Sequence, residues 1–249
     1  MTPVTISTRE FDAFIFDLDG VITDTAAVHE AAWKILFDQY LAERAEAGSQ
    51  PQRPFDDSDY RMYVDGRARA DGVEGFLRSR GIHLPRGEAA DSVSQETAWG
   101  VANRKNKLFL RTLARQGVHA FPSSIALIHN LRDRGLATAV VTASRNCVAV
   151  LKAAGISDLF DARVDGVDAD RLHLPGKPDA AMFLEAARRL RVSPSRAAVA
   201  EDAIAGVQAA RRGGFKLVVG VDRRGDPDAL TAAGADVVVS DLAEIAVVA

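Results

Sequence analysis

The sequence predicts an α/β fold, a doubly wound parallel β-sheet interrupted by a long helical insert. Three observations support this prediction. A short apolar run at 13–16 ends in two aspartates, as a buried strand would. No strand pattern follows until residue 139, and after that point short β-rich runs alternate with amphipathic helices. The first strand must therefore join a sheet formed by the later strands.

The first strand brings two carboxylates to one site. Asp17 and Asp19 flank Leu18, so both project to the same side at the end of the strand, and Gly20 lets the backbone turn there. Like charges this close stay ionised only beside a cation, and oxygen ligands of this kind suit Mg²⁺. The alternative is a solvated acidic turn, and the spacing does not match an EF-hand.

A helix is predicted at 25–41, directly after the carboxylate loop. Thr25 is a candidate N-cap, and the spacing places His29 and Trp33 on the same helix face as Thr25. If the helix leaves the loop directly, its first turns overhang the site. The alternative is a face that packs on a neighbouring element.

The rest of the insert is expected to be helical as well. In chain order we expect a polar loop at 42–62, a turn at 65–66 carrying Arg67 and Arg69, a helix at 71–80 closed by Gly81, and a helix at 92–115. The last helix contains the charged run 103–107, which a solvated face would explain. Residues 25–115 are therefore predicted to form a helical cap domain.

Residues 116–249, together with 1–24, are predicted to form the sheet domain. We expect strands at 139–142, 160–164, 197–200, 216–221 and 235–240. Helices are expected between them at 125–134, 147–154, 179–191 and 205–212. Such alternation is typical of a parallel sheet with helices on both faces.

Ligands of open α/β sheets bind outside the carboxyl ends of the strands. Three later segments place polar side chains there: Thr142 and Ser144, then Lys177, then Glu201 with Asp202. Hydroxyls and backbone amides at a helix start can hold phosphate oxygens. Lys177 precedes Pro178, a favoured first helical residue. A lysine at a helix start is electrostatically unfavoured, so its presence there favours a functional role. Each segment alone could be an ordinary helix N-terminus, but together they form one anion and metal site.

Composition excludes several function classes. A net charge of −3 gives no general attraction to nucleic acid or to an anionic membrane. The single cysteine, Cys147, excludes an intrachain disulfide framework and a cysteine zinc cluster. No signal core and no run of 18 apolar residues occur. We expect a cytoplasmic monomer without nucleic-acid or membrane partners.

The ordered motifs resemble those of the haloacid dehalogenase-like superfamily over essentially the whole chain. They are DLDGV at 17–21, TASRN at 142–146, Lys177-Pro178 and Glu201-Asp202. Within that superfamily the chain is most similar to the β-phosphoglucomutases, through DLDGVITDTAAVHEAAW, the RARADGV turn, RKN and ASRN. The resemblance implies a Rossmann-like doubly wound core with an inserted α-helical cap.

The resemblance also implies a role for each matching residue. Asp17 would be the nucleophile that becomes an aspartyl-phosphate, and Asp19 the general acid and base. Thr142, Ser144 and Lys177 would stabilise the transferring phosphoryl group. Mg²⁺ would be held by Asp17, the backbone carbonyl of Asp19, Glu201 and Asp202. The substrate, a phosphosugar, would be contacted by His29, Trp33, Arg69, Lys105, Asn106, Ala143, Arg145 and Asn146, with Arg69 on its distal phosphate.

The implied activity is a Mg²⁺-dependent mutase that interconverts β-glucose 1-phosphate and glucose 6-phosphate through glucose 1,6-bisphosphate. A sugar-phosphate phosphatase on the same fold is the alternative, because both reactions use every core residue. A silent binding module is a third reading, disfavoured because all core groups are present. Three departures from the family bear on the choice of substrate: Ala203 where serine is common, Arg145 where some members have lysine, and a longer 42–62 loop.

Overall fold

The structure, a computed structural model, describes residues 4–249, which form two compact units. One unit, here called the core, contains the described residues up to Asp24 together with Val118–Ala249. The other, the cap, is Thr25–Gly117. The second boundary falls at 117/118 instead of the predicted 115/116, because helix α4 continues to Gln116 and ends at Gly117, whose φ is 74°.

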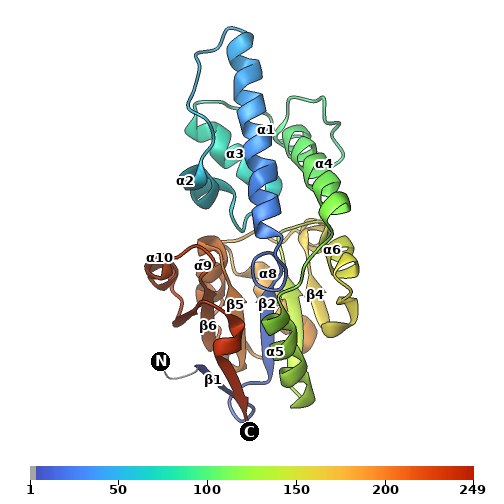
Figure 1. Cartoon of the computed structure of the whole chain (residues 1–249), viewed down its shortest axis with the longest axis vertical. Coiled ribbons are helices and arrows are strands. Elements are labelled where there is room, and N and C mark those ends of the chain that lie inside the picture. Colours follow the sequence, from blue (N-terminus) through green and yellow to red (C-terminus); the bar gives the residue numbers. More distant parts are fainter. Residues whose placement is uncertain (1–3) are drawn as a thin grey trace. The chain divides into compact units, whose positions relative to one another are not determined.

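The core is built on a six-stranded parallel sheet with the order β4-β3-β2-β5-β6-β7 (Figure 1). Its strands are β2 (Ala13–Asp17), β3 (Ala137–Val141), β4 (Ala162–Val164), β5 (Ala197–Glu201), β6 (Leu217–Val221) and β7 (Val237–Val239). The chain proceeds outward from β2 in both directions, so the strand order reverses beside β2. Every residue of β2 is buried, which explains its continuous apolar run. The predicted doubly wound sheet is confirmed.

The register brings the ends of three strands level. Asp17 pairs with Val141 of β3, and Phe16 pairs with Ala200 of β5. The next residues along β3 and β5, Thr142 and Glu201, therefore lie beside the end of β2. Sheet geometry alone thus collects residues that are far apart in the sequence.

Helices cover both faces of the sheet. They are α5 (Pro122–Asp133), α6 (Cys147–Ala153), α7 (Gly166–Leu172), α8 (Ala181–Leu190), α9 (Ile204–Arg212) and α10 (Pro227–Ala233). Phe183 of α8 and Val207 of α9 join Ile15 in one apolar cluster. Helix α5 contacts β3 and lies on the other side of the sheet (Figure 1).

Several short core elements were not predicted. Strand β1 (Val4–Ser7) pairs in parallel with β8 (Ile245–Val248) outside the main sheet. Helix α7 follows Asp165, whose carboxylate accepts the Val167 and Asp168 N–H groups, and α10 follows Asp226 with Pro227 in its first turn. These caps are sequence signals that would have located both helices.

The cap consists of helices around an aromatic cluster. Its elements are α1 (Ala26–Glu46), α2 (Asp57–Asp59), a π-helical segment (Tyr60–Val64), α3 (Arg69–Ser79) and α4 (Ala98–Gln116). The Phe37 ring lies 5.0 Å from that of Phe55 and 4.2 Å from that of Phe76, measured between centroids. Burial of these rings supplies the apolar contacts that hold the helices together.

Two predicted cap boundaries were wrong. The polar loop expected at 42–62 is shorter, because α1 continues through good helix formers to Glu46, and Asp56 and Asp59 form a capping box that starts α2. The last helix starts at Ala98, because the Thr97 hydroxyl caps it by accepting the Gly100 N–H at 3.0 Å. Thr25 occupies the N-cap position of α1 but makes no side-chain cap bond.

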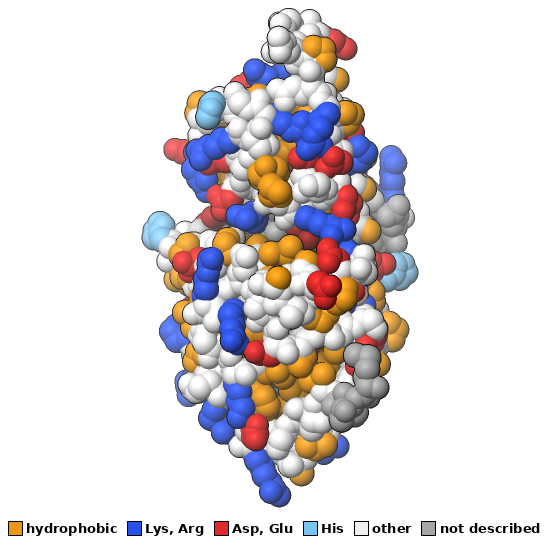
Figure 2. All heavy atoms as spheres, turned by 90° about the vertical axis from the view of Figure 1, so that its left-hand side faces the viewer, with side chains coloured by type: hydrophobic (Ala, Val, Ile, Leu, Met, Phe, Trp, Pro, Cys, Tyr) orange, Lys and Arg blue, Asp and Glu red, His pale blue; other side chains and the backbone are white. Residues whose placement is uncertain are grey.

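Charge is distributed without strong segregation on the face that Figure 2 presents. Basic and acidic side chains are interspersed over the described residues of that face. Over residues 4–249, no helix combines the length and the apolar character that crossing a bilayer requires.

Candidate active site

Asp17 lies at the end of β2 and is nearly buried, with 6% of its surface exposed. The ammonium of Lys177 donates to Oδ1 of Asp17 and also to Oε1 of Glu201. The side chain of Lys177 is 1% exposed, so the ion pair is almost fully removed from water. One lysine therefore joins the carboxylates at the ends of two adjacent strands, as the sequence predicted from their places in the chain.

Lys177 reaches this position from a turn and not from the start of a helix. The Lys177–Pro178 peptide is cis, and α8 begins only at Ala181. The carboxylate of Asp179 accepts the Ala181 N–H at 2.9 Å and so organises the turn. The prediction that Pro178 begins the helix was therefore wrong, although the expected direction of the lysine was right.

The electrostatics of this cluster favour an added cation. Burial raises the pKa of Asp17 well above its ordinary value; Glu201 and Asp19 raise it further, and Lys177 opposes them. Burial disfavours the charged form of Lys177, but the Asp17 and Glu201 carboxylates outweigh it and raise the pKa of the ammonium. Two carboxylates thus contact a single ammonium, and Asp19 adds a third acidic group beside Asp17, so acidic groups outnumber basic ones in this cluster.

Glu201 is fully buried and is held at both oxygens. Its Oε1 accepts from Lys177, and its Oε2 accepts the Ala203 N–H at 2.8 Å. A Cβ at position 206 would collide with this carboxylate, so only glycine fits there. The importance of Gly206 was not predicted. The signal was available, because an interior helical glycine costs about 1 kcal/mol relative to alanine.

A series of hydroxyl contacts organises the loop after β3. The Thr142 Oγ1 donates to Asp19 Oδ2 at 3.1 Å and accepts the Ser144 N–H at 3.0 Å. The Ser144 Oγ in turn accepts the Asn146 N–H at 3.2 Å, and Asn146 is the N-cap residue of α6. Thr142 therefore connects the second predicted motif directly to the first. The N-cap residue of α6 is Asn146 and not Ser144.

Ala143 and Arg145 lie against helix α7. A Cβ at position 166 would come 2.6 Å from the Ala143 carbonyl oxygen, so Gly166 permits this close approach. Arg145 forms an ion pair with Asp170 of α7. The predicted substrate-contacting loop is thus supported by a helix that was not predicted.

The predicted metal ligands are of the right chemical type but are not arranged as a finished site. Over residues 4–249, no group of three or more Asp, Glu, His or Cys side chains is placed to hold a metal ion. Asp17 and Glu201 point to Lys177, and the Asp202 carboxylate lies against Gly20. The donor set consists of oxygens with excess negative charge, and this chemistry fits Mg²⁺.

In the cap, the structure brings three predicted residues together. The Lys105 Nζ lies 2.5 Å from His29 Nδ1 and 4.9 Å from the centroid of the Trp33 ring. It also lies 5.0 Å from the Phe109 ring, and Lys105 is only 3% exposed. The run 103–107 is therefore not simply a solvated face, because its central lysine is buried against aromatic rings.

Arg69 and Asn106 are the remaining cap residues of the predicted site. Arg69 is the first residue of α3, and its guanidinium carbon lies 5.8 Å from the centroid of the Trp99 ring on α4. Asn106 is half-buried on α4, next to Lys105.

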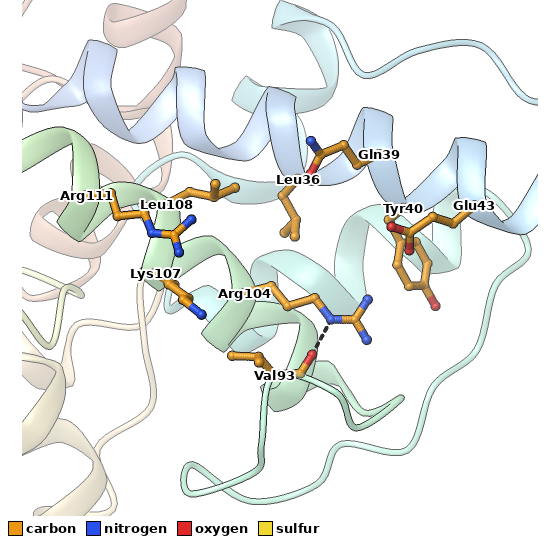
Figure 3. Close-up of a pocket in the computed structure, with 9 residues that line it drawn as sticks. All are labelled: Leu36, Gln39, Tyr40, Glu43, Val93, Arg104, Lys107, Leu108 and Arg111. Atoms are coloured by element: carbon orange, nitrogen blue, oxygen red, sulfur yellow. Dashed lines mark hydrogen bonds between the residues drawn. The ribbon is translucent and has the colours of Figure 1, made fainter.

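A hollow of about 150 Å³ on the cap lies elsewhere on α4 (Figure 3). It is lined by Leu36, Gln39, Tyr40 and Glu43 of α1, by Val93, and by Arg104, Lys107, Leu108 and Arg111 of α4. Arg104 donates to the Val93 carbonyl oxygen at 2.5 Å, which fixes one wall. None of the predicted site residues lines this hollow.

Comparison with known proteins identifies a family. The model of the haloacid dehalogenase-like hydrolases matches residues 11–214. A β-phosphoglucomutase from Mycobacterium bovis is 46% identical over 237 residues, which are 94% of this chain and 90% of that protein. One from Bacillus subtilis is 32% identical over 94% of this chain and 91% of its own length.

Solved structures give the same result. The crystal structure of β-phosphoglucomutase from Clostridium difficile superposes with a TM-score of 0.73 and 27% identity, covering 94% of this chain and 92% of that chain. Names of relatives and the family model together indicate an enzyme, either a phosphotransferase or a phosphatase.

Proposed function

The chain belongs to the haloacid dehalogenase-like hydrolase family, and from that premise we propose that it is a Mg²⁺-dependent phosphosugar mutase. It interconverts β-glucose 1-phosphate and glucose 6-phosphate through glucose 1,6-bisphosphate. The Lys177 bridge between Asp17 and Glu201 supports phosphoryl transfer, and the 46% identity to a β-phosphoglucomutase favours the mutase over the phosphatase. This bridge places a potential nucleophile beside a buried cation, as transfer of an anionic phosphoryl group requires.

In the first half-reaction the phosphorylated enzyme transfers its phosphoryl group to the substrate. The C6 hydroxyl of β-glucose 1-phosphate attacks phosphorus, the bond to the Asp17 carboxylate breaks, and Asp19 accepts the hydroxyl proton. The product is the bisphosphate. A positioned carboxylate that moves this proton accelerates the step by about 10²–10⁴-fold. The hydrogen bond from Thr142 to Asp19 supports the role, because it orients the carboxylate.

In the second half-reaction the bisphosphate presents its C1 phosphate to Asp17. The carboxylate attacks phosphorus, Asp19 returns the proton to the leaving C1 oxygen, and glucose 6-phosphate is released. Lys177, Thr142 and Ser144 stabilise the equatorial oxygens in both half-reactions, a contribution that is often the largest in such sites. Ala143, Arg145 and Asn146 contact the substrate from the same loop.

Mg²⁺, when bound, neutralises charge on Asp17 and on the transferring group. Asp17, Asp202 and the backbone carbonyl of Asp19 would hold it directly. Glu201 completes the acidic set, and its two contacts with Lys177 and Ala203 favour a supporting position. The high pKa of buried Asp17 supports the need for this cation.

The cap residues select the acceptor. Arg69 grips the distal phosphate, while His29, Trp33, Lys105 and Asn106 contact the sugar. The aromatic surroundings of Lys105 support this role, because an amphipathic sugar face packs well on such rings. Closure of the cap would exclude water, so that the phosphoryl group passes to a sugar hydroxyl.

Phosphorus NMR tests the proposal. The protein is incubated with Mg²⁺, β-glucose 1-phosphate and a trace of glucose 1,6-bisphosphate. The mutase accumulates glucose 6-phosphate with little free phosphate. Free phosphate as the main product would instead establish the sugar-phosphate phosphatase, an alternative that the description of the family as hydrolases favours.

A further inference from the structure

Arg223 is a conspicuous core residue that the proposed mechanism does not use. It follows β6 and is about one-fifth exposed at its side chain. Its guanidinium carbon lies 4.0 Å from the centroid of the Phe121 ring, a stacked cation–π geometry. Its Nε donates to the backbone carbonyl of Gly20 at 2.7 Å, and its Nη1 donates to that of Ser240 at 3.2 Å.

The loop that receives this contact is the one that carries Asp19. Backbone bonds close most of it: the Gly20 N–H donates to Thr23 at 2.8 Å, and the Ile22 and Thr23 N–H groups both donate to Leu18, at 3.0 and 2.9 Å. These bonds use the carbonyls of Leu18 and Thr23. The Gly20 carbonyl is held from outside the loop, by Arg223.

Gly20 also lies between the two acidic motifs. Its φ is 88°, in the left-handed region, and a Cβ there would collide with the carboxylate of Asp202. The Gly20 peptide therefore has Asp202 packed against its α-carbon and Arg223 bound at its carbonyl. Any movement of this peptide changes the distance between Asp202 and the Asp17–Asp19 loop.

The position of Arg223 is itself fixed by its neighbours. The Asp222 carboxylate accepts the N–H groups of Arg224, Gly225 and Asp226 at 3.0, 2.8 and 3.1 Å, which folds the loop that follows β6. The Asp241 carboxylate lies 3.9 Å from Nη1 and balances its charge. Arginine presents a flat face for stacking together with donors in two directions, which lysine does not.

We propose that Arg223 is a positioning residue of the candidate active site: by holding the Gly20 peptide it sets the spacing between the carboxylates at the ends of β2 and β5. The inference rests on the proposed function in one respect, that these carboxylates bind a divalent cation and transfer a phosphoryl group. Arg223 acts through Gly20 and touches neither the substrate nor the cation. Its loss weakens cation binding and slows phosphoryl transfer together.

The test compares Arg223→Gln and Arg223→Lys with wild type and with Arg211→Gln. Arg211 is a matched control, because it is a core arginine whose ion pair with Asp236 is exposed. Mn²⁺ affinity is measured by the EPR signal of the free ion, and kcat and KM are measured for p-nitrophenyl phosphate. Both Arg223 variants are expected to lose about 10–100-fold in Mn²⁺ affinity and kcat, and KM is expected to change by less than about threefold.

The lysine variant separates positioning from charge. A single ammonium cannot stack on Phe121 while it reaches both the Gly20 and Ser240 carbonyls, so Arg223→Lys is expected to do no better than Arg223→Gln. Full activity and full Mn²⁺ affinity in either variant would overturn the inference. So would variants whose only change is a lower Tm, since a merely structural role predicts that outcome.

A second variant covers the case in which both Arg223 variants fail to fold. Phe121→Leu keeps the arginine but removes the stacked ring, and the same two quantities are expected to fall by about two- to fivefold. Unchanged values there would contradict the inference. Failure of the premise that these carboxylates bind a divalent cation and transfer a phosphoryl group looks different, because wild-type protein would then bind no Mn²⁺ at the site and turn over no phosphate ester.

Discussion

In the core, the charged side chains of the candidate site stand at the ends of neighbouring strands, whereas in the cap they lie on helices against aromatic rings. Lys177 is enclosed by the Asp17 and Glu201 carboxylates and lies 5.0 Å from the centroid of the Phe183 ring, whereas Lys105 lies over both the Trp33 and Phe109 rings. Carboxylates around a lysine suit chemistry on an anionic group, while cations on aromatic surfaces suit recognition of a polar ligand with apolar faces. We infer that the core performs transfer and the cap selects the acceptor.

The largest expected effect of any substitution lies in the core. Lys177→Met leaves two buried carboxylates without their cation, so the free energy of unfolding is expected to fall by about 3–5 kcal/mol in a chelator. Turnover of p-nitrophenyl phosphate by the folded protein should fall by about 10²–10³-fold. Urea unfolding and steady-state kinetics measure the two losses.

Lys216→Met is the matched control for that substitution, because Lys216 is an exposed core lysine paired with Glu10 at 3.1 Å. It should behave like wild type in both measurements. A Lys177→Met protein with wild-type stability and turnover would refute the assignment of the bridge to the active site.

A cap substitution should separate acceptor choice from transfer. Arg69→Ala removes the predicted grip on the distal phosphate, so isomerisation of glucose 1-phosphate is expected to fall by about 10²-fold. Turnover of p-nitrophenyl phosphate, which has no distal phosphate, should change by less than about threefold. Coupled assays of both substrates provide the ratio.

Arg78→Ala serves as the control on the same helix, since its side chain is 63% exposed and pairs with Glu74. It should leave both activities unchanged. Equal losses on the two substrates in Arg69→Ala would count against the proposed division between core and cap.

A smaller effect is expected for the buried cap lysine. Lys105→Met should raise KM for the sugar phosphate by about tenfold, the value of one contact to a charged group. The Tm should stay the same or rise, because a buried ammonium is costly to desolvate and methionine packs well on aromatic rings. Lys107→Met, on the same helix but exposed, should change neither quantity. A Tm loss without a change in KM would indicate a structural lysine.

The smallest predicted effect concerns an ion cluster of the core away from the candidate site. Arg189 donates to Asp168 and Glu185 at 2.9 and 2.8 Å. Hydrogen bonds from Arg189 lower the pKa of Asp168 to about 2, and those from Arg188 and Arg189 lower the pKa of Glu185 to about 2. The pKa values of both carboxyl groups are lower in the folded protein than in the unfolded chain. The stabilisation that their ion pairs give is therefore complete above about pH 4.5 and is lost as pH falls towards 2.

Arg189→Gln should therefore reduce the free energy of unfolding by about 1 kcal/mol at pH 6 and by less at pH 2.5. Urea titrations at both pH values measure the difference. The same loss at both values would show that packing, and not these ion pairs, accounts for the effect.

Much of the core could be predicted because a parallel sheet imposes its geometry on the sequence. The chain order of the apolar runs, with Asp17, Thr142 and Glu201 directly at their ends, is enough to bring these residues to one edge. What escaped prediction depends on close approach between distant segments. The fit of Gly206 against Glu201, and the contact of Arg223 with Gly20, leave no periodic pattern in the sequence.

The cap was harder to predict because helix spacing defines a face but not its neighbour. The spacing of Thr25, His29 and Trp33 placed all three on one side of α1, yet nothing in it identified Lys105 as the residue packed there. The charged neighbours of Lys105 also suggested a solvated helix. Tertiary packing decided the outcome, as it commonly does for helix surfaces.

The most direct test of the division between core and cap follows one phosphoryl group. The protein is labelled with ³²P-glucose 1,6-bisphosphate, and the labelled residue is located by peptide mass spectrometry. The labelled protein is then chased with glucose 6-phosphate or with buffer. The Asp17→Asn variant, which should take up no label, serves as the control. We expect label on Asp17 that passes to the sugar phosphate at least about 10²-fold faster than to water. Label on another residue, or equal loss with and without the sugar phosphate, would contradict this expectation.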